Sequence, residues 1–365
     1  MFDLRLDEIQ LPASERDVDS LISWMIDTLC LHRRRGEATA DGGTFSPIHR
    51  ILKENLFFDS SKGYETREMA DDLSLTPAAI HHHLTRLVSA GMVSSTNGKS
   101  WRNYHLTGGS LSSAIQTMSS RAAMIHKQRF EFLDSKWKRG DNVRLEMELP
   151  ADDSPPLSIR VKEWGPLEDG QSEISRFMAD MGLLGERPGK EILSDSISVK
   201  LFEMLLNTAN PISIDEAAAA INAPKPRVGR ILERFRATGL IERVARTDRL
   251  SSALWSAMNT QYMRRGEDWM LKKGGFERLS IPNSLLKHLK KGKLTPEIVA
   301  KEMKKIEPRN QMLLLNLLGG RLPLGHRMVG ESVAMLKKRS NENLERILRR
   351  ISRVGKMLEE TITRG

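Results

Sequence analysis

Apolar residues recur every three or four positions along most of the chain, which is the spacing of amphipathic helices rather than of strands. The first clear example is the segment 17–33, whose apolar positions mark one helical face: Val18, Leu21, Ile22, Met25, Ile26 and Leu29. The following segment, RRRGEATADGGT (33–44), is rich in glycine and small residues and indicates a loop. Residues 1–44 are therefore expected to form an N-terminal amphipathic helix and loop.

The helical pattern tightens from residue 45 onward and then gives way to a hairpin. Pro47 suits the first turn of a helix, and REMADDLSL predicts a second helix. Thr76 and Pro77 suit the N-cap and the first position of a third helix. The next stretch, MVSSTNGKSWRNYHLT, predicts two short strands around Asn97-Gly98, a strong hairpin signal. Three helices followed by a hairpin is the order of a winged helix-turn-helix.

This region resembles the winged-helix domain of ArsR-type transcription regulators over about residues 46–108. The shared features are the start Glu68-Met69-Ala70, the helix core from Ile80 to Leu84, the exit L-x-x-A-G-x-V, and the closing Tyr-x-Leu-Thr of the wing. The resemblance implies a winged helix-turn-helix fold and DNA binding. It covers less than a fifth of the chain.

A second copy of the pattern lies further along the chain. The segment 222–241, NAPKPRVGRILERFRATGLI, aligns without a gap on 74–93, SLTPAAIHHHLTRLVSAGMV. The alignment places apolar residues on apolar residues and glycine on glycine: Ile80 on Val228, Leu84 on Leu232, Leu87 on Phe235 and Gly91 on Gly239. An internal repeat predicts a repeated structural unit. We expect a more degenerate winged helix over 195–258, with its wing within 242–258 although no Asn-Gly turn is present there.

The rest of the chain is predicted to be mostly helical. A helix is expected over 110–137, followed by a hairpin made of VRLEMEL and LSIRVKEW and by a short helix from residue 173. Near the C-terminus Leu344, Ile351 and Leu358 recur at heptad spacing, which fits either a short coiled coil or packing on the chain's own body.

The predicted fold class is mainly α, with tandem winged helix-turn-helix domains on a helical scaffold and small β-hairpins. The expected regions are the N-terminal helix and loop (1–44), the first winged helix (45–108), a connector of helix, hairpin and short helix (109–194), the second winged helix (195–258) and a basic helical C-terminal region (259–365).

The positive charge of the chain is concentrated near its C-terminus. The formal net charge is +10, and residues 264–365 hold 24 lysines and arginines against 11 acids. The remainder holds 33 against 36, and residues 45–108 alone are close to neutral, with 7 against 6. A basic C-terminal region can attract phosphates and so aid DNA binding, or it can be a solvated helical face.

Several classes of protein are not expected from this sequence. Cys30 is the only cysteine, so an intramolecular disulfide or a multi-cysteine zinc site is excluded, and a reducing cytoplasm is the simplest setting. The N-terminus shows no signal-peptide pattern, and no apolar run approaches the length of a membrane span. Motifs such as G-x-S-x-G and H-E-x-x-H do not occur. We therefore expect neither enzymatic activity nor a cofactor.

Three consecutive histidines, His81 to His83, stand in the third predicted helix. Successive helical residues are about 100° apart, so the three side chains cannot share one face. The neighbouring positions offer no ligand at the i, i+4 spacing of helical metal sites. Metal-sensing ArsR-type proteins use cysteines or Asp/His pairs, whereas the helix 110–137 offers only His126. We expect no metal site, and we expect His83 to be packed beside the buried stripe, as the resemblance implies.

The first turns of the second motif helix enter the major groove in helix-turn-helix proteins. The residues expected to contact DNA are Ala79, His81, His82, Thr85 and Arg86 on this helix, Lys99 and Arg102 in the wing, and Lys225, Arg227, Arg230 and Arg234 in the second copy. Imidazole, hydroxyl and guanidinium groups can bond base edges or phosphates.

The function predicted from these patterns is a DNA-binding transcription regulator. Its partner is double-stranded DNA, and a homodimer through the C-terminal helices is one option. The alternative is a winged-helix scaffold for protein interactions, as in chromosome-segregation or basal transcription complexes. A third hypothesis is a repressor that senses a metal or small molecule. The segment 140–190 is a candidate region for an effector, but no residue pattern there identifies one.

Overall fold

The structure is a computed structural model that describes residues 1–11, 17–32, 45–98, 102–137, 140, 154–185, 188–322 and 324–364. The described chain is mainly helical, with small antiparallel sheets. None of its described helices is both long enough and apolar enough to cross a bilayer.

The first half of the chain ends with a long helix. Its elements are β1 (Asp3–Asp7), α1 (Val18–Thr28), α2 (Pro47–Arg50), a π-helix (Ile51–Leu56), β2 (Tyr64–Glu65), α3 (Thr66–Leu73), α4 (Pro77–Ser89), β3 (Val93–Asn97), β4 (Arg102–Leu106), a 3-10 turn (Thr107–Gly109) and α5 (Leu111–Lys136).

The second half also ends with a long helix. Its elements are β5 (Ser158–Lys162), α6 (Glu173–Asp180), a 3-10 turn (Gly189–Ile192), α7 (Ile197–Asn207), α8 (Ile214–Ala220), α9 (Lys225–Ala237), β6 (Ile241–Ala245), a 3-10 turn (Thr247–Arg249), α10 (Leu250–Lys272), α11 (Asn283–Lys290), α12 (Pro296–Met303), α13 (Pro308–Leu317), β7 (Leu324–Met328) and α14 (Val333–Arg364).

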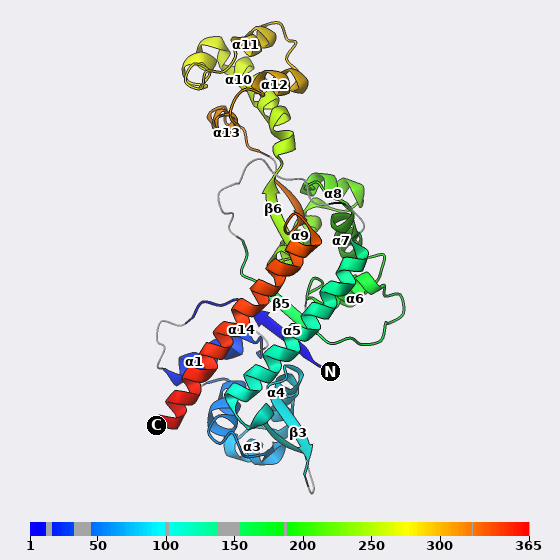
Figure 1. Ribbon diagram of the computed structural model, residues 1–365, viewed down its shortest axis with the longest axis vertical. Helices are drawn as coiled ribbons and strands as arrows, with labels where there is room; N and C mark the ends of the chain where they lie inside the picture. Colours follow the sequence, from blue (N-terminus) through cyan, green and yellow to red (C-terminus); the bar gives the residue numbers. More distant parts are fainter. Residues whose placement is uncertain are drawn as a thin grey trace.

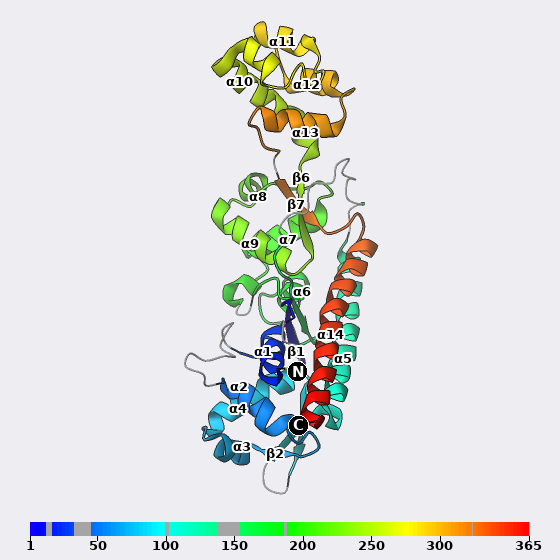
Figure 2. The ribbon, with the colours of Figure 1, turned by 90° about the vertical axis from the view of Figure 1, so that its left-hand side faces the viewer.

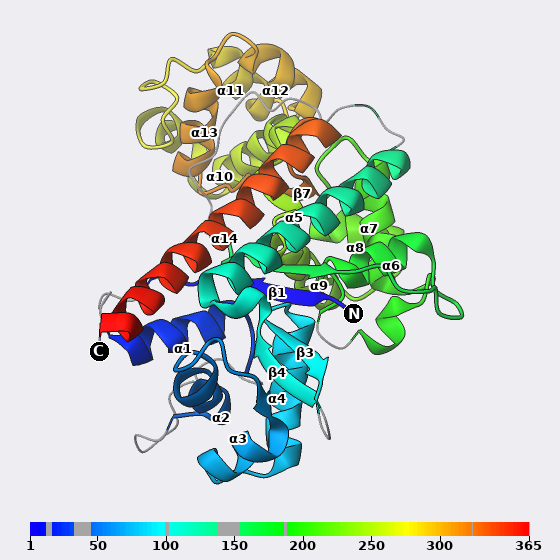
Figure 3. The same cartoon turned by 60° about the horizontal axis from the view of Figure 1, so that its bottom comes forward.

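The molecule is elongated, with α10 to α13 at one end and α3, α4 and the β3–β4 hairpin at the other (Figure 1). The long helices α5 and α14 run beside each other along one side (Figures 2 and 3). The described residues form three apolar cores, each in one part of this body. The first joins the elements around α4 to both long helices, the second surrounds α7 to α9, and the third lies among α10 to α13.

The elements expected within 45–108 are present in the expected order. The strands form the order β2-β4-β3, and β3 and β4 form the hairpin with Val93 opposite Leu106 and Asn97 opposite Arg102. The π-helical turn after Arg50 was not foreseen.

The prediction that the second wing lies within 242–258 is wrong. Residues from Leu250 onward form α10, because Leu250, Leu254 and Met258 repeat at helical spacing and are all buried in the third core. The partner of β6 is β7, which follows only after α10 to α13 and places Ile241 opposite Met328. The expected boundary between residues 258 and 259 is therefore also wrong, because α10 runs across it.

The hairpin expected from LSIRVKEW is not local. The strand β5 pairs with β1, which lies near the N-terminus of the chain. The segment 143–149, which was expected to pair with β5, lies outside the described residues. Leu4 and Leu6 of β1 are buried. Since Ile159 and Val161 of β5 are buried too, the two strands share one apolar face, which local periodicity could not reveal.

The C-terminal heptads pack on the chain's own body, which is one of the two outcomes left open by the sequence. The helix α14 runs antiparallel to α5, because Glu359 near its end accepts a hydrogen bond from the Ser112 amide at 2.8 Å. At the opposite end of the pair, Lys337 lies 2.7 Å from Asp134. Between them Gly355 faces Ile115, where a glycine permits close approach of the two helices.

Candidate nucleic-acid interface

The candidate interface centres on α4, whose limits follow from local interactions. The Thr76 hydroxyl accepts a hydrogen bond from the Ala79 amide at 3.2 Å, and Pro77 takes the first helical position. The helix buries one stripe made of Ile80, Leu84 and Leu87. Gly91 follows with a φ of 81°, a left-handed conformation that ends the helix.

The three histidines of α4 lie in different surroundings. His81 and His82 are exposed, whereas His83 is half-buried beside the apolar stripe. Burial, followed by the charges of His82 and Arg86, lowers the pKa of His83 to about 4. Within the described residues, no three His, Cys, Asp or Glu side chains gather as metal ligands would. The imidazoles of His81 and His82 are thus accessible at the surface of α4.

Two other predicted contact residues of α4 differ from each other. Thr85 is exposed, and its hydroxyl donates to the His81 carbonyl oxygen at 2.8 Å. Arg86 is half-buried and donates to the carbonyl oxygen of Leu31 at 3.0 Å. Arg86 thus ties α4 to the end of α1, a role that the sequence analysis missed, and we leave it out of the proposed interface.

The remaining predicted positions of the first copy are only partly described. Ala79 is half-buried at the start of α4. Arg102 is exposed at the first position of β4. Lys99 lies outside the described residues.

The equivalent helix α9 is less basic at its surface than the sequence suggested. Lys225 pairs with Asp215 of α8 at 2.9 Å, and Arg227 pairs with Glu191 at 2.5 Å. Arg230 is exposed, with no acid within ion-pair distance in the described chain. The ion pairs come from other elements, so the helical stripe of arginines did not predict them.

Arg234 occupies the position in α9 that Arg86 occupies in α4. Arg86 comes two residues after Leu84, and Arg234 comes two residues after the equivalent Leu232. It is half-buried, and its guanidinium lies beside Gly185, just after α6. Both arginines therefore face the chain segment that follows the short helix of their own half. We leave Arg234 out of the proposed interface because it is half-buried against this segment.

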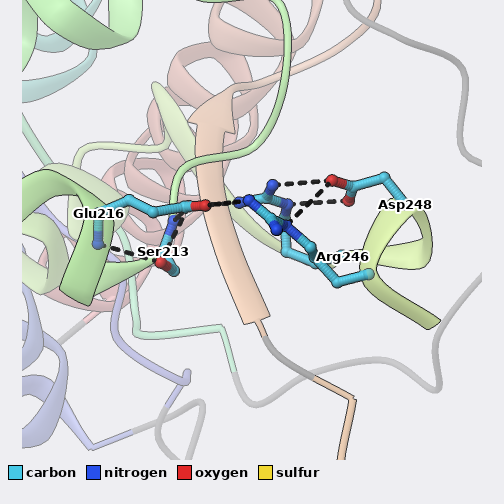
Figure 4. A network of polar contacts seen from close by, with 5 residues as sticks. Ser213, Glu216, Arg246 and Asp248 are labelled. Carbon is cyan, nitrogen blue, oxygen red and sulfur yellow. Dashed lines mark hydrogen bonds and ion pairs between the residues drawn. The ribbon is translucent and has the colours of Figure 1, made fainter. Parts of the chain in front are cut away.

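A charged network joins α8 to the segment between β6 and α10 (Figure 4). Glu216 of α8 accepts hydrogen bonds from the Ser213 amide at 2.9 Å and from Arg246 at 2.5 Å, and Arg246 also bonds Asp248. Burial alone would raise the pKa of Glu216, but the bonds from Ser213 and Arg246 outweigh it and hold the pKa at about 2. The capping-box pattern S-x-x-E was the only sequence signal for this network.

Comparison of the chain with protein-family models, with curated proteins and with solved structures finds no match. The functional assignment therefore rests on the chain's own residues and geometry.

Proposed function

We propose that the chain is a DNA-binding transcription regulator in which α4 reads duplex DNA. The observation that supports this most is the exposure of three polar side chains on α4, His81, His82 and Thr85. A short helix precedes α4 and a β-hairpin follows it, which is the arrangement of a winged helix-turn-helix. Exposed imidazole and hydroxyl groups there can bond base edges and phosphates.

A second winged helix would comprise α7 to α9 with β6 and β7. The sheet supports this assignment, because Ile212 bridges His326 of β7 just as β2 bridges β4 in the first copy. The helices α10 to α13 are then an insertion at the tip of the second wing. Arg230 is the exposed residue of α9 that we assign to DNA contact.

The first test of the proposed function is binding to duplex DNA across a salt series. We expect the logarithm of the affinity to fall linearly with the logarithm of salt concentration, because bound phosphates release counterions. His82→Ala is expected to weaken binding about tenfold, within the roughly 1–3 kcal/mol that one good base contact provides. Fluorescence anisotropy with labelled duplex measures both effects.

The matched control is Gln128→Ala, which truncates an exposed polar residue on α5. It should bind DNA as the unaltered chain does. Absence of binding at low salt, or an affinity that does not respond to salt, would contradict the proposed function.

The basic charge of the inserted helices supports an accessory role in DNA binding. Residues 246–323 hold 16 lysines and arginines against 7 acids. Lys287, Lys291 and Lys293, at the end of α11 and just after it, are all exposed, without an ion-pair partner in the described chain. The cluster lies at the end of the molecule beyond β6, where cationic side chains can contact phosphates flanking the bound site (Figure 1).

Replacing Lys287, Lys291 and Lys293 with alanine should weaken DNA binding and make it less dependent on salt. Three lost phosphate contacts would reduce the slope of log affinity against log salt by about 2–3. The control removes the same charge from exposed positions of the long helices: Lys127, Lys338 and Lys356. Equal slopes for the two triple variants would show that the inserted helices do not contact DNA.

Two observations favour a second candidate function, a protein-interaction scaffold. Residues 45–108 are close to neutral in charge. Phe58, in the loop before β2, is 78% exposed. Exposed aromatic residues are frequent anchors of protein interfaces. Under this alternative, His82→Ala leaves DNA affinity unchanged, and Phe58→Ser abolishes binding of a protein partner. The same pair of variants therefore separates the two functions.

A further inference from the structure

The two halves of the chain repeat the same order of elements. One constant offset in residue number places β1 on β5 and the start of α1 on the start of α6. The offset of the aligned repeat segments places α4 on α9 and β3 on β6. Beyond the inserted helices, a third, larger offset places β4 on β7 and the start of α5 on the start of α14. The repeat therefore extends over the whole body apart from α10 to α13.

The backbone contacts between the halves are reciprocal. Arg5 of β1 lies opposite Arg160 of β5, and the two residues are equivalent because each is the central residue of its strand. On one side of this pair the Glu8 amide donates to the Leu157 carbonyl oxygen at 2.7 Å. On the other side the Glu163 amide donates to the Phe2 carbonyl oxygen at 2.9 Å. Each bond is the equivalent of the other, so an approximate two-fold axis passes between the two arginines.

The side chains of Glu8 and Glu163 also make reciprocal contacts between the two halves. Glu8, from the first half, pairs with Arg346 of α14 at 3.0 Å. Glu163, from the second half, pairs with Arg121 of α5 at 3.0 Å. Each half thus anchors its carboxylate on the long helix of the other half. Such self-complementary exchange is the mark of an isologous two-fold interface.

The axis also relates α4 to α9. A Cβ atom on Gly91, after α4, would lie 3.0 Å from the Phe2 ring, and one on Gly239, after α9, would lie 3.0 Å from Leu157. Phe2 and Leu157 are equivalent, because each immediately precedes its strand, and so are the two glycines. Both helices therefore end against the central strands in the same way, and in Figure 2 both lie on the side away from α5 and α14.

We infer that a single chain binds one DNA duplex on its own, with α4 and α9 contacting two half-sites of different sequence. Dimeric helix-turn-helix proteins place two recognition helices, related by a two-fold axis, in successive major grooves. Here the axis lies within one chain. The inference rests on the proposed function and specifies its ligand as non-palindromic duplex DNA.

The half-sites differ because the equivalent surface residues differ. Where α4 presents His82, α9 presents Arg230, and both are exposed. Glu233, which is equivalent to Thr85, is engaged by Arg236 at 2.8 Å and does not take part. Arginine pairs best with guanine, whereas imidazole and hydroxyl groups bond other edges. The inserted helices add basic charge next to α9 alone. A palindrome would therefore satisfy only one of the two helices.

The long helices also indicate a monomer. Their apolar faces pack against each other within the chain, and the residues at this seam are nearly inaccessible: Ile115, Met118, Ala122, Leu344, Ile351 and Leu358. A homodimer through the C-terminal helices, the option raised by the sequence, would have to separate this pair first. The interface that two copies would supply is already present within one chain.

The test begins with selection of bound sites from a duplex pool with a random core of about 30 base pairs, roughly three helical turns. Sedimentation equilibrium then measures the mass of the chain alone and with the selected duplex. We expect a free chain of 41.3 kDa, one chain per duplex, and a selected site without two-fold symmetry. Footprinting should show that His82→Ala loses protection of one half-site and Arg230→Ala loses protection of the other.

The outcomes separate this inference from the proposed function. Two chains on a palindromic site, or loss of the same half-site in both variants, would overturn the single-chain inference and leave DNA binding standing. Failure of the unaltered chain to enrich any duplex at low salt would overturn both. Gln128→Ala, which should leave both half-sites protected, controls for the effect of substitution itself.

Discussion

Asp180→Leu should lower the free energy of unfolding by about 3–5 kcal/mol, because it leaves the buried charge of Arg129 without its partner. Arg129 of α5 is 1% exposed, and its Nη2 lies 3.0 Å from Asp180 Oδ2 of α6 in an ion pair without hydrogen-bond geometry. The guanidinium also lies 4.1 Å from the centre of the Trp164 ring. Burial raises the pKa of Asp180 and lowers that of Arg129. Burial therefore disfavours the charged form of each side chain when its partner is absent.

Urea unfolding measures this effect through the transition midpoint and slope. The double variant Asp180→Leu with Arg129→Met should recover part of the loss, because it removes the buried unpaired charge of Arg129. Recovery stays incomplete because Arg176, which lies 3.9 Å from Asp180, also loses its carboxylate partner. The surface pair gives the control: Asp134→Asn, which removes a half-exposed partner of Lys337, should cost about 0–1 kcal/mol. A single Asp180→Leu variant as stable as the unaltered chain would show that the pair is not structurally required.

Acidification from pH 6.5 to 4 should destabilise the chain by about 3 kcal/mol through His126 alone, at about 1.4 kcal/mol per pH unit. His126 is buried between α5 and α14, where Nδ1 lies 2.9 Å from Asn341 Oδ1 and Nε2 lies 3.2 Å from Ser340 Oγ. Burial lowers its pKa from 6.5 to about 4, against the opposing effect of Asn341. Since the folded-state pKa lies below the unfolded value, this stability is present above pH 6.5 and is lost as the pH falls through 4.

His126→Gln should unfold with a shallower dependence on pH, because glutamine can keep hydrogen bonds in the seam without taking up a proton. Urea midpoints at pH 7.5 and pH 4.5 measure the difference between this variant and the unaltered chain. Burial also lowers the pKa of His83 and His326 to about 4, so part of the acid sensitivity should remain. Equal pH dependence in both chains would contradict the assignment, and Gln128→Ala on the same helix controls for substitution.

The helix α4 shows what the sequence by itself determined. Its start follows from the cap at Thr76 and the proline after it, and its end follows from Gly91. These features act over a few residues, so they can be recognised without knowing the rest of the fold. The repeat could be found in the same way, since the sequence of α9 aligns on that of α4 without a gap and has the same apolar spacing. The exposure of His81 and His82 also followed from helical geometry.

Only the tertiary structure decided which strands pair and which cations are free. The strand β6 pairs with β7 across an insertion, and β1 pairs with β5 across most of the first half. Several arrangements satisfy the alternation of each strand, and the choice depends on which buried faces meet in the final fold. The same holds for the site, where Arg86 bonds the Leu31 carbonyl and Arg227 pairs with Glu191. Such contacts join residues that are distant in sequence, so their formation depends on how whole elements pack together. Local periodicity carries no information about that packing.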